Sequence, residues 1–143
     1  MTAPVNFQQL VDGAGDAVMV SNAGGAIVYW NAACERLFGF SAQEAMGQSL
    51  DLIIPQRQQG RHWEGYHKTM ASGITRYGTS LLKVPAVHKE GKPLSIAFTV
   101  SLLTDAAGAV EGIVAIVRDD TQRFNDERTL RKRIAELEAK AAS

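Results

Sequence analysis

The sequence predicts an α+β domain in which helices cover one face of an antiparallel sheet. Three observations support this prediction. Two short apolar strands, at residues 17–21 and 27–30, are joined by a turn at residues 22–25. Short amphipathic helices fill the middle of the chain, and from residue 76 the apolar period changes to two. Strand pairs on both sides of a helical segment pack into one sheet, with the helices on one face.

The bulk composition fits one soluble, cytoplasmic domain. The chain has 143 residues, 45% of them hydrophobic, which is enough for a core. Its 15 basic and 15 acidic residues balance, so no basic surface favours nucleic acid. A single cysteine excludes an internal disulfide framework. The sequence has no signal peptide and no apolar run of membrane-spanning length, so we expect no membrane association.

Four helical segments are predicted before the second group of strands, at residues 6–13, 31–39, 41–47 and 56–71. Asn31 is the predicted N-cap of the second segment. Ser41 opens the third, and Ser41-x-x-Glu44 is a capping box. An apolar turn at residues 50–54 ends at Pro55, directly before the fourth segment.

Alternating strands and a final helix make up the rest of the chain. The strands are predicted at residues 82–87, 94–102 and 110–117. The third is almost continuously apolar, which predicts a central place in the sheet. The tail is helical, with an apolar stripe of Leu130, Ile134, Leu137 and Ala141. This stripe is shorter than three heptads, so it would dimerise only when anchored to a folded domain.

Several stretches together resemble the PAS family. They cover residues 6–121 and comprise Asp16-Ala17-Val18, Gly25-x-Ile27-x-Tyr29-x-Asn31-x-Ala33-x-Glu35-x-x-Phe38-Gly39-Phe40, Glu44-x-x-Gly47, His88-Lys89-Glu90-Gly91, Gly112 and Asp119-x-Thr121. The resemblance implies a five-stranded antiparallel sheet and a role as a sensor in signal transduction. It also implies an N-terminal helical cap at residues 1–15, a sensor domain at 16–121 and a C-terminal signalling helix at 122–143.

The resemblance implies partners as well. A homodimer is expected through the N- and C-terminal helices, together with a signalling partner protein or effector domain. No catalytic activity is expected, because the sequence has no Ser-His-Asp set, no metal-spaced cluster and no phosphate loop.

Flavin is not an expected cofactor. The flavin-binding light sensors of the family carry a cysteine inside an Asn-Cys-Arg-Phe-Leu-Gln-like run. Cys34 lies instead in the segment that follows Asn31, and no such run exists. We expect Cys34 to pack as a small apolar residue.

Heme b is the cofactor that the resemblance favours, for gas or redox sensing. In the FixL-type heme sensors of this family, a proline opens the helix and the axial histidine follows seven residues later. Pro55 and His62 have this spacing. Those sensors have a tyrosine three residues after the histidine, whereas here Gly65 has that place and Tyr66 follows. A neutral imidazole facing an apolar pocket suits heme iron, and its other nitrogen needs a partner that the sequence does not identify.

The remaining predicted cofactor-binding residues are apolar and comprise Leu82, Ile96, Phe98, Ile113 and Ala115. Leu82 stands where the FixL-type sensors have a distal arginine. The pocket therefore lacks a donor for oxygen and favours an apolar guest or carbon monoxide.

Other polar candidates on the predicted ligand-binding helix are weaker. His67 lies about 140° around the helix from His62, so the two cannot share one iron, and His67 is the alternative sole ligand. Arg57 and Arg61 are candidates for the heme propionates or for the surface. His88 lies in a turn and is expected to be solvated. Two further functions stay open: binding of a non-heme small molecule, and a ligand-free dimerisation or protein-interaction module.

Overall fold

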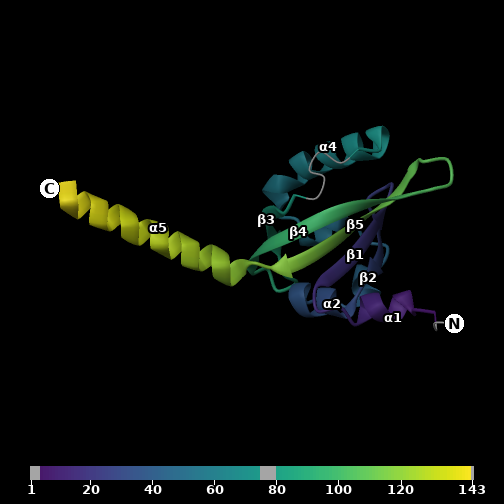
Figure 1. Cartoon of the computed structure of the whole chain (residues 1–143), viewed down its shortest axis with the longest axis horizontal. Coiled ribbons are helices and arrows are strands. Elements are labelled where there is room, and N and C mark those ends of the chain that lie inside the picture. The colour runs from purple at the N-terminus through teal and green to yellow at the C-terminus, as the bar shows by residue number, and fades with distance from the viewer. Residues whose placement is uncertain (1–3, 75–79, 143) are drawn as a thin grey trace.

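An antiparallel sheet of five strands forms the centre of the molecule (Figure 1). The computed structural model describes residues 4–74 and 80–142. The strands in chain order are β1 (Ala17–Asn22), β2 (Ile27–Trp30), β3 (Leu82–Val87), β4 (Pro93–Thr104) and β5 (Val110–Asp119). Their order across the sheet is β2-β1-β5-β4-β3, and every pairing is antiparallel. The predicted fold class and the central place of β5 are confirmed.

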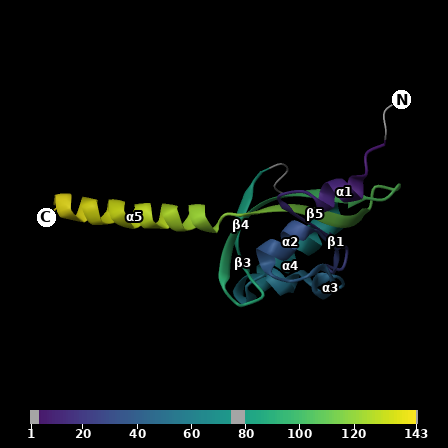
Figure 2. The same ribbon diagram turned by 90° about the horizontal axis from the view of Figure 1, so that it is seen from below.

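The helices in chain order are α1 (Phe7–Asp12), α2 (Ala32–Phe38), α3 (Ala42–Ala45), the 3₁₀ turn η1 (Leu50–Ile53), α4 (Gln56–Ser72) and α5 (Thr121–Ala142). In Figure 2, α2, α3 and α4 gather on one side of the sheet, while α5 extends away from the sheet. None of the described helices is long and apolar enough to cross a membrane. We call the sheet face beneath α2, α3 and α4 the inner face.

The local signals at the helix ends act as predicted. The Asn31 side chain caps α2 by accepting from the backbone N–H of Cys34. Ser41 and Glu44 form the reciprocal capping box of α3. Glycine in the left-handed conformation ends α2 at Gly39 and α4 at Gly73. The predicted start of the two-residue period at residue 76 lies outside the described residues.

The core lies between the inner face and the short helices. Its fully buried side chains comprise Phe38, Ile27, Asn31 and Cys34. Trp30 packs beside Phe38, with ring centroids 5.4 Å apart, and donates its indole N–H to the Phe40 carbonyl at 2.9 Å. Both Trp30 and Cys34 are therefore packing residues, which confirms the expectation for Cys34.

Asn31 is the buried polar residue that ties the N-terminal half together. Its Oδ1 accepts from the backbone N–H groups of Val18 at 2.9 Å and Cys34 at 3.1 Å. Its Nδ2 donates to the carbonyls of Val11 at 2.9 Å and Asp16 at 3.1 Å. One side chain thus joins α1, the loop before β1, β1 itself and α2.

The turn between β3 and β4 clamps the end of α2. The Lys89 backbone N–H donates to the Phe38 carbonyl at 2.8 Å, and the Lys89 side chain pairs with Glu44. The His88 ring lies against Gly39, where an added Cβ would come within 2.5 Å of His88 Cε1. His88 is half-buried, so the prediction of a solvated side chain is wrong. The close approach of this turn to Gly39 covers the ring.

The helix α5 begins where β5 ends, and hydrogen bonds hold this junction to β4. The backbone N–H of Asp120 donates to the Ser95 carbonyl at 2.7 Å, and the Thr121 hydroxyl accepts from the Ser95 N–H at 3.0 Å. No residue of α5 among those described is buried. Its exposed apolar side chains are Phe124, Leu130, Ile134 and Leu137.

Candidate functional site

The helix α4 is held to the sheet mainly by Tyr66, its one buried residue, all residues of α4 being described. The Tyr66 hydroxyl lies 2.8 Å from Ser21 Oγ and 2.5 Å from the Asn22 carbonyl at the end of β1. Ser21 is the register partner of Ile113 on β5. Tyr66, predicted to bind the cofactor, is therefore engaged with β1 beside one of the predicted pocket residues.

Trp63 holds α4 to the turn of the β1–β2 hairpin and to η1. Its indole N–H donates to Asp51 Oδ1 of η1 at 2.7 Å. Its ring lies against Gly25, where an added Cβ would come within 2.3 Å of the ring atoms Cη2 and Cζ3. Gly25 has a φ of 85° and no side chain, so the turn both needs glycine and leaves room for the indole.

His62 lies beside both of these anchors and is half-buried. Its ring centroid is 4.6 Å from that of Trp63 and 5.6 Å from that of Tyr66. Its Nδ1 is buried and has no hydrogen-bond partner among the described residues. Burial lowers the pKa of His62, and the charge of Asp51 opposes this effect. The side chain is therefore held as a neutral imidazole, the form that donates a lone pair to a metal.

The predicted apolar pocket residues all lie on the inner face. Leu82 of β3 is opposite Phe98 of β4, and Phe98 is opposite Val117 of β5. Residues opposite one another in an antiparallel sheet share a face, as do residues two apart along a strand. By this rule the shared face carries Leu82, Ile96, Phe98, Ile113 and Ala115.

The inner face is only partly covered beneath α4. Ile96 is buried, whereas Leu82, Phe98, Ile113 and Ala115 are half-buried. All four side chains are apolar, and Phe98, Ile113 and Ala115 pack against the buried core.

The other polar candidates on α4 face solvent. His67, Arg57 and Arg61 are all exposed. The His67 ring centroid is 6.1 Å from that of Trp63. His67 is therefore more accessible to water than the half-buried His62.

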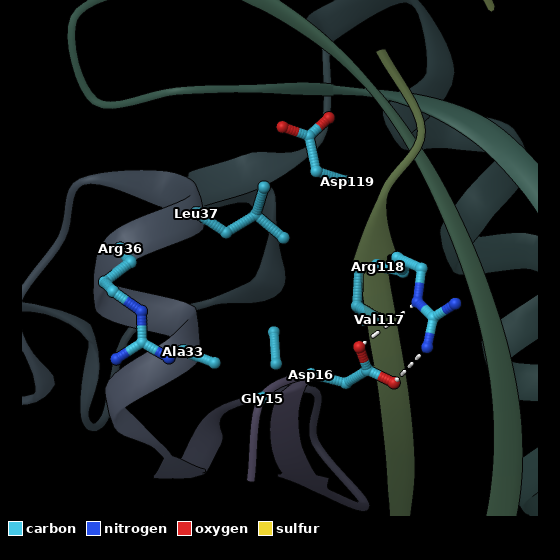
Figure 3. Close-up of a pocket in the computed structure, with 9 residues that line it drawn as sticks. Gly15, Asp16, Ala33, Arg36, Leu37, Val117, Arg118 and Asp119 are labelled. Carbon is cyan, nitrogen blue, oxygen red and sulfur yellow. Dashed lines mark hydrogen bonds and ion pairs between the residues drawn. The ribbon is translucent and has the colours of Figure 1, made fainter. Parts of the chain in front are cut away.

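Two hollows lie elsewhere on the molecule. The larger, about 350 Å³, lies between α2 and the end of β5 (Figure 3). Its charged rim includes the ion pair between Arg118 and Asp16, with 3.1 Å between nitrogen and oxygen. The smaller, about 260 Å³, is lined by Thr99, Val100, Ser101, Val114 and Ile116 of β4 and β5. No predicted cofactor-binding residue lines either hollow, so the cavity expected between the helices and the sheet does not coincide with them.

Sequence reasoning missed the residues that position α4. Ser21, Asp51 and Gly25 hold Tyr66 and Trp63, and Gln58 of the same helix has a buried side-chain oxygen. The sequence could have indicated Gln58, since it lies four residues before His62 and therefore on the same side of the helix. The other three contacts join distant parts of the chain and leave no local pattern.

Comparison with known proteins places this geometry in a family. The family model described as the PAS fold matches residues 6–119. An uncharacterized protein from Azorhizobium caulinodans is 31% identical over 124 residues, which are 86% of this chain and 17% of that protein. The sensor protein FixL of Bradyrhizobium diazoefficiens is 37% identical over 65 residues, covering 46% of this chain and 11% of FixL. The oxygen sensor protein DosP of Escherichia coli is 27% identical over 103 residues, covering 72% of this chain and 12% of DosP. The chain thus spans only a small part of these relatives.

Solved structures share the fold at lower identity. The PAS domain of a Colwellia psychrerythraea protein superposes with a TM-score of 0.71 at 22% identity, covering 81% of this chain and 95% of that one. An RNA-binding light-oxygen-voltage receptor gives a TM-score of 0.72 at 18% identity, covering 94% of this chain and 41% of the receptor. The strand order, the helices on the inner face and the match over residues 6–119 agree: the chain belongs to the PAS family.

Proposed function

We propose that this PAS domain binds heme b between α4 and the inner face, with His62 as the axial ligand, and senses a gas or redox state. The observation that carries the proposal is the environment of the His62 imidazole. Its imidazole is half-buried, its pKa is lowered by burial, and its Nδ1 has no partner among the described residues. It also follows Pro55 by seven residues, the spacing of the FixL-type heme sensors that the sequence resembles.

The residues of the site fit this group. When bound, heme b supplies an iron centre that changes oxidation state and takes up diatomic gases. His62 provides the nitrogen ligand, and the inner face provides an apolar wall of Leu82, Ile96, Phe98, Ile113 and Ala115. These side chains exclude water and offer no hydrogen-bond donor, so the wall favours an apolar guest. The proposal assigns no catalytic reaction to the chain.

The relatives support the same kind of function. FixL is named a sensor protein and DosP an oxygen sensor protein, and each matches part of this chain. Signalling would pass from residues 16–121 to the helix at 122–143, since the Ser95 hydrogen bonds fix the start of α5 to β4, a strand of the inner face. The helix α1, which lies within the proposed N-terminal cap, is joined to β1 and α2 through Asn31.

Hemin reconstitution tests the proposal. Purified apoprotein mixed with hemin is expected to show a Soret band shifted from that of free hemin, at one heme per chain. His62→Ala removes the only nitrogen ligand proposed and should weaken hemin affinity by a factor of 10 or more, about 1.4 kcal/mol. His67→Ala is the matched control on the exposed side of the same helix and should bind like the wild type. A wild-type chain without a shifted Soret band would exclude heme, and loss in His67→Ala alone would move the ligand to His67.

A second candidate function is a ligand-free dimerisation or protein-interaction module. The observation that favours it is the apolar surface of the terminal helices. Leu130, Ile134 and Leu137 are 62%, 53% and 49% exposed along α5, and Phe7 of α1 is 72% exposed. Apolar side chains repeated along one helix face are the usual seam of a helix pair. Dimerisation through these helices would also be compatible with heme binding, because a sensor needs a readout.

Removal of the tail tests the dimer. Ending the chain after Asn125 is expected to convert a dimer to a monomer in sedimentation experiments, since it deletes the exposed stripe. Ile134→Glu in the full chain should have the same effect, because it places a charge in the seam. Arg128→Glu is the control, as Arg128 is exposed on α5 outside the stripe. Unchanged sedimentation of the truncated chain would exclude α5 as the dimer interface.

A further inference from the structure

One side chain of α4 crosses to the sheet and is bonded there. Tyr66 is 6% exposed, and its hydroxyl lies 2.8 Å from Ser21 Oγ and 2.5 Å from the Asn22 carbonyl. A hydroxyl has one proton and a carbonyl only accepts, so Tyr66 donates to Asn22 and its oxygen accepts from Ser21. Both hydrogen bonds end on β1, and Ser21 is itself buried. The hydroxyl of Tyr66 therefore ties α4 directly to the sheet.

The Tyr66 side chain lies on the inner face, beside His62. Ser21 is opposite Ile113 in the sheet register, and Met19 and Ser21, two apart on β1, are both buried. The ring centroid of Tyr66 is 5.6 Å from that of His62. Here α4 and β1 are separated by the length of one tyrosine side chain, and no residue of α4 lines either of the two hollows. A ligand between α4 and the inner face needs the space beside His62 that this ring occupies.

The other ties of α4 hold its N-terminal half. Gln59 and Trp63 also bond outside the helix, but their partners lie in the segment 51–54, directly before it. In the C-terminal half, Tyr66 makes the hydrogen bonds to the sheet, and Met70 adds a half-buried apolar contact with the core. Loss of the Tyr66 bonds would therefore free the C-terminal half of α4 while its first turns stay attached.

Two glycines make α4 a weak helix by itself. Gly60 and Gly65 lie inside it, where glycine lowers helix stability relative to alanine. Neither has a positive φ, and nothing beyond the neighbouring turns of the helix lies within 4 Å of the place where a Cβ would be. Packing and backbone geometry therefore do not require glycine at either position. Such a helix depends on its contacts with the sheet and is expected to fray when it leaves them.

We propose that Tyr66 is the latch of the ligand site, which admits a ligand only when the Tyr66 hydroxyl leaves β1 and the C-terminal half of α4 moves off the inner face. The structure is then the closed arrangement, in equilibrium with a minor open one. A ligand that binds only the open arrangement has its measured affinity reduced by the open fraction. The inference rests on the proposed function for the place of the ligand, whereas the opening of α4 needs no ligand.

Hydrogen exchange of the full-chain apoprotein measures the opening. The amides of residues 66–72 are expected to exchange faster than those of β5, and with a weaker dependence on urea, because opening exposes less surface than unfolding. Tyr66→Phe keeps the ring and removes the hydroxyl, so exchange at residues 66–72 should become about 10-fold faster, the effect of two neutral hydrogen bonds. Tyr29→Phe is the matched control, because the Tyr29 hydroxyl is bonded to Asp12, away from α4. It should leave exchange in α4 unchanged.

Stopped-flow mixing with hemin measures access to the site. The association rate constant is expected to rise about 10-fold in Tyr66→Phe and to stay at the wild-type value in Tyr29→Phe. Ser21→Ala removes one of the two hydrogen bonds and should raise the rate about threefold. A residue that only supports the structure would not speed association when it is changed, so the direction of the effect is diagnostic.

The two measurements have separate outcomes. Unchanged exchange at residues 66–72 in Tyr66→Phe and Ser21→Ala would overturn the latch, and so would faster exchange without faster hemin association in chains that bind hemin. Ser21→Ala decides alone if Tyr66→Phe does not fold. If no variant takes up hemin, faster exchange in Tyr66→Phe would support the latch and overturn the proposed heme site alone.

Discussion

Replacing Asn31 with alanine is expected to lower the free energy of unfolding by about 3–5 kcal/mol, one of the two largest effects in this chain. The Asn31 side chain is 1% exposed and makes four hydrogen bonds to backbone groups of four segments. Alanine would leave the N–H groups of Val18 and Cys34 without their acceptor. An unsatisfied buried donor costs about 1–3 kcal/mol, and loss of the α2 cap adds about 1 kcal/mol.

Urea unfolding followed by circular dichroism measures this loss. Asn6→Ala is the matched control, because Asn6 also caps a helix through a 3.0 Å bond to the Gln9 N–H but is exposed. It should cost no more than about 1 kcal/mol. Asn31→Asp keeps both accepted hydrogen bonds, but its second oxygen would face the carbonyls of Val11 and Asp16, so its cost should be at least as large as that of Asn31→Ala. An Asn31→Ala cost as small as that of Asn6→Ala would show that the buried hydrogen bonds are not the source of stability.

Replacing Gly25 with alanine is expected to lower the free energy of unfolding by about 2–4 kcal/mol. Two effects add. The backbone at Gly25 has a φ of 85°, where an L side chain is strained by about 1 kcal/mol. The new Cβ would also lie 2.3 Å from the Trp63 ring, and the ring is held in place by the indole bond to Asp51. Relief of this overlap would require α4 to move away from the β1–β2 hairpin.

A double-mutant cycle separates the two effects. In a Trp63→Ala background the ring is gone, so Gly25→Ala should cost only the backbone strain, about 1 kcal/mol. Gly47→Ala is the matched control in the wild-type background, because Gly47 has a φ of 83° and open space around its Cα. The two costs should agree. The same cost for Gly25→Ala with and without Trp63 would mean that the indole does not hold α4 to the hairpin.

The Gly25 variant also connects stability to the proposed site. Trp63 and His62 are neighbours in sequence, with ring centroids 4.6 Å apart. A shift of the indole would therefore move the imidazole relative to the inner face. Hemin affinity should drop in Gly25→Ala although Gly25 itself lines no part of the proposed pocket.

The sequence alone determined the elements and most of their ends. Asn31 and the Ser41-x-x-Glu44 box are local signals that act within one helical turn, and the structure has both as predicted. The strand period of two determined which residues share a sheet face, because side chains alternate along a strand. For that reason Ile96 and Phe98 of β4 could be assigned to one face before any pairing was known.

The tertiary structure decided how α4 sits on the sheet and which groups surround His62. Tyr66 reaches Ser21 across 45 positions, and the Trp63 ring meets Gly25 across the fold. Such contacts depend on the placement of whole elements, and no spacing within the helix encodes them. The burial of each side chain depends on the same placement. His62 is half-buried, His67 is exposed and the side-chain oxygen of Gln58 is buried. The sequence places a histidine at position 62, whereas the packing of α4 against the hairpin and the inner face decides the environment of its side chain.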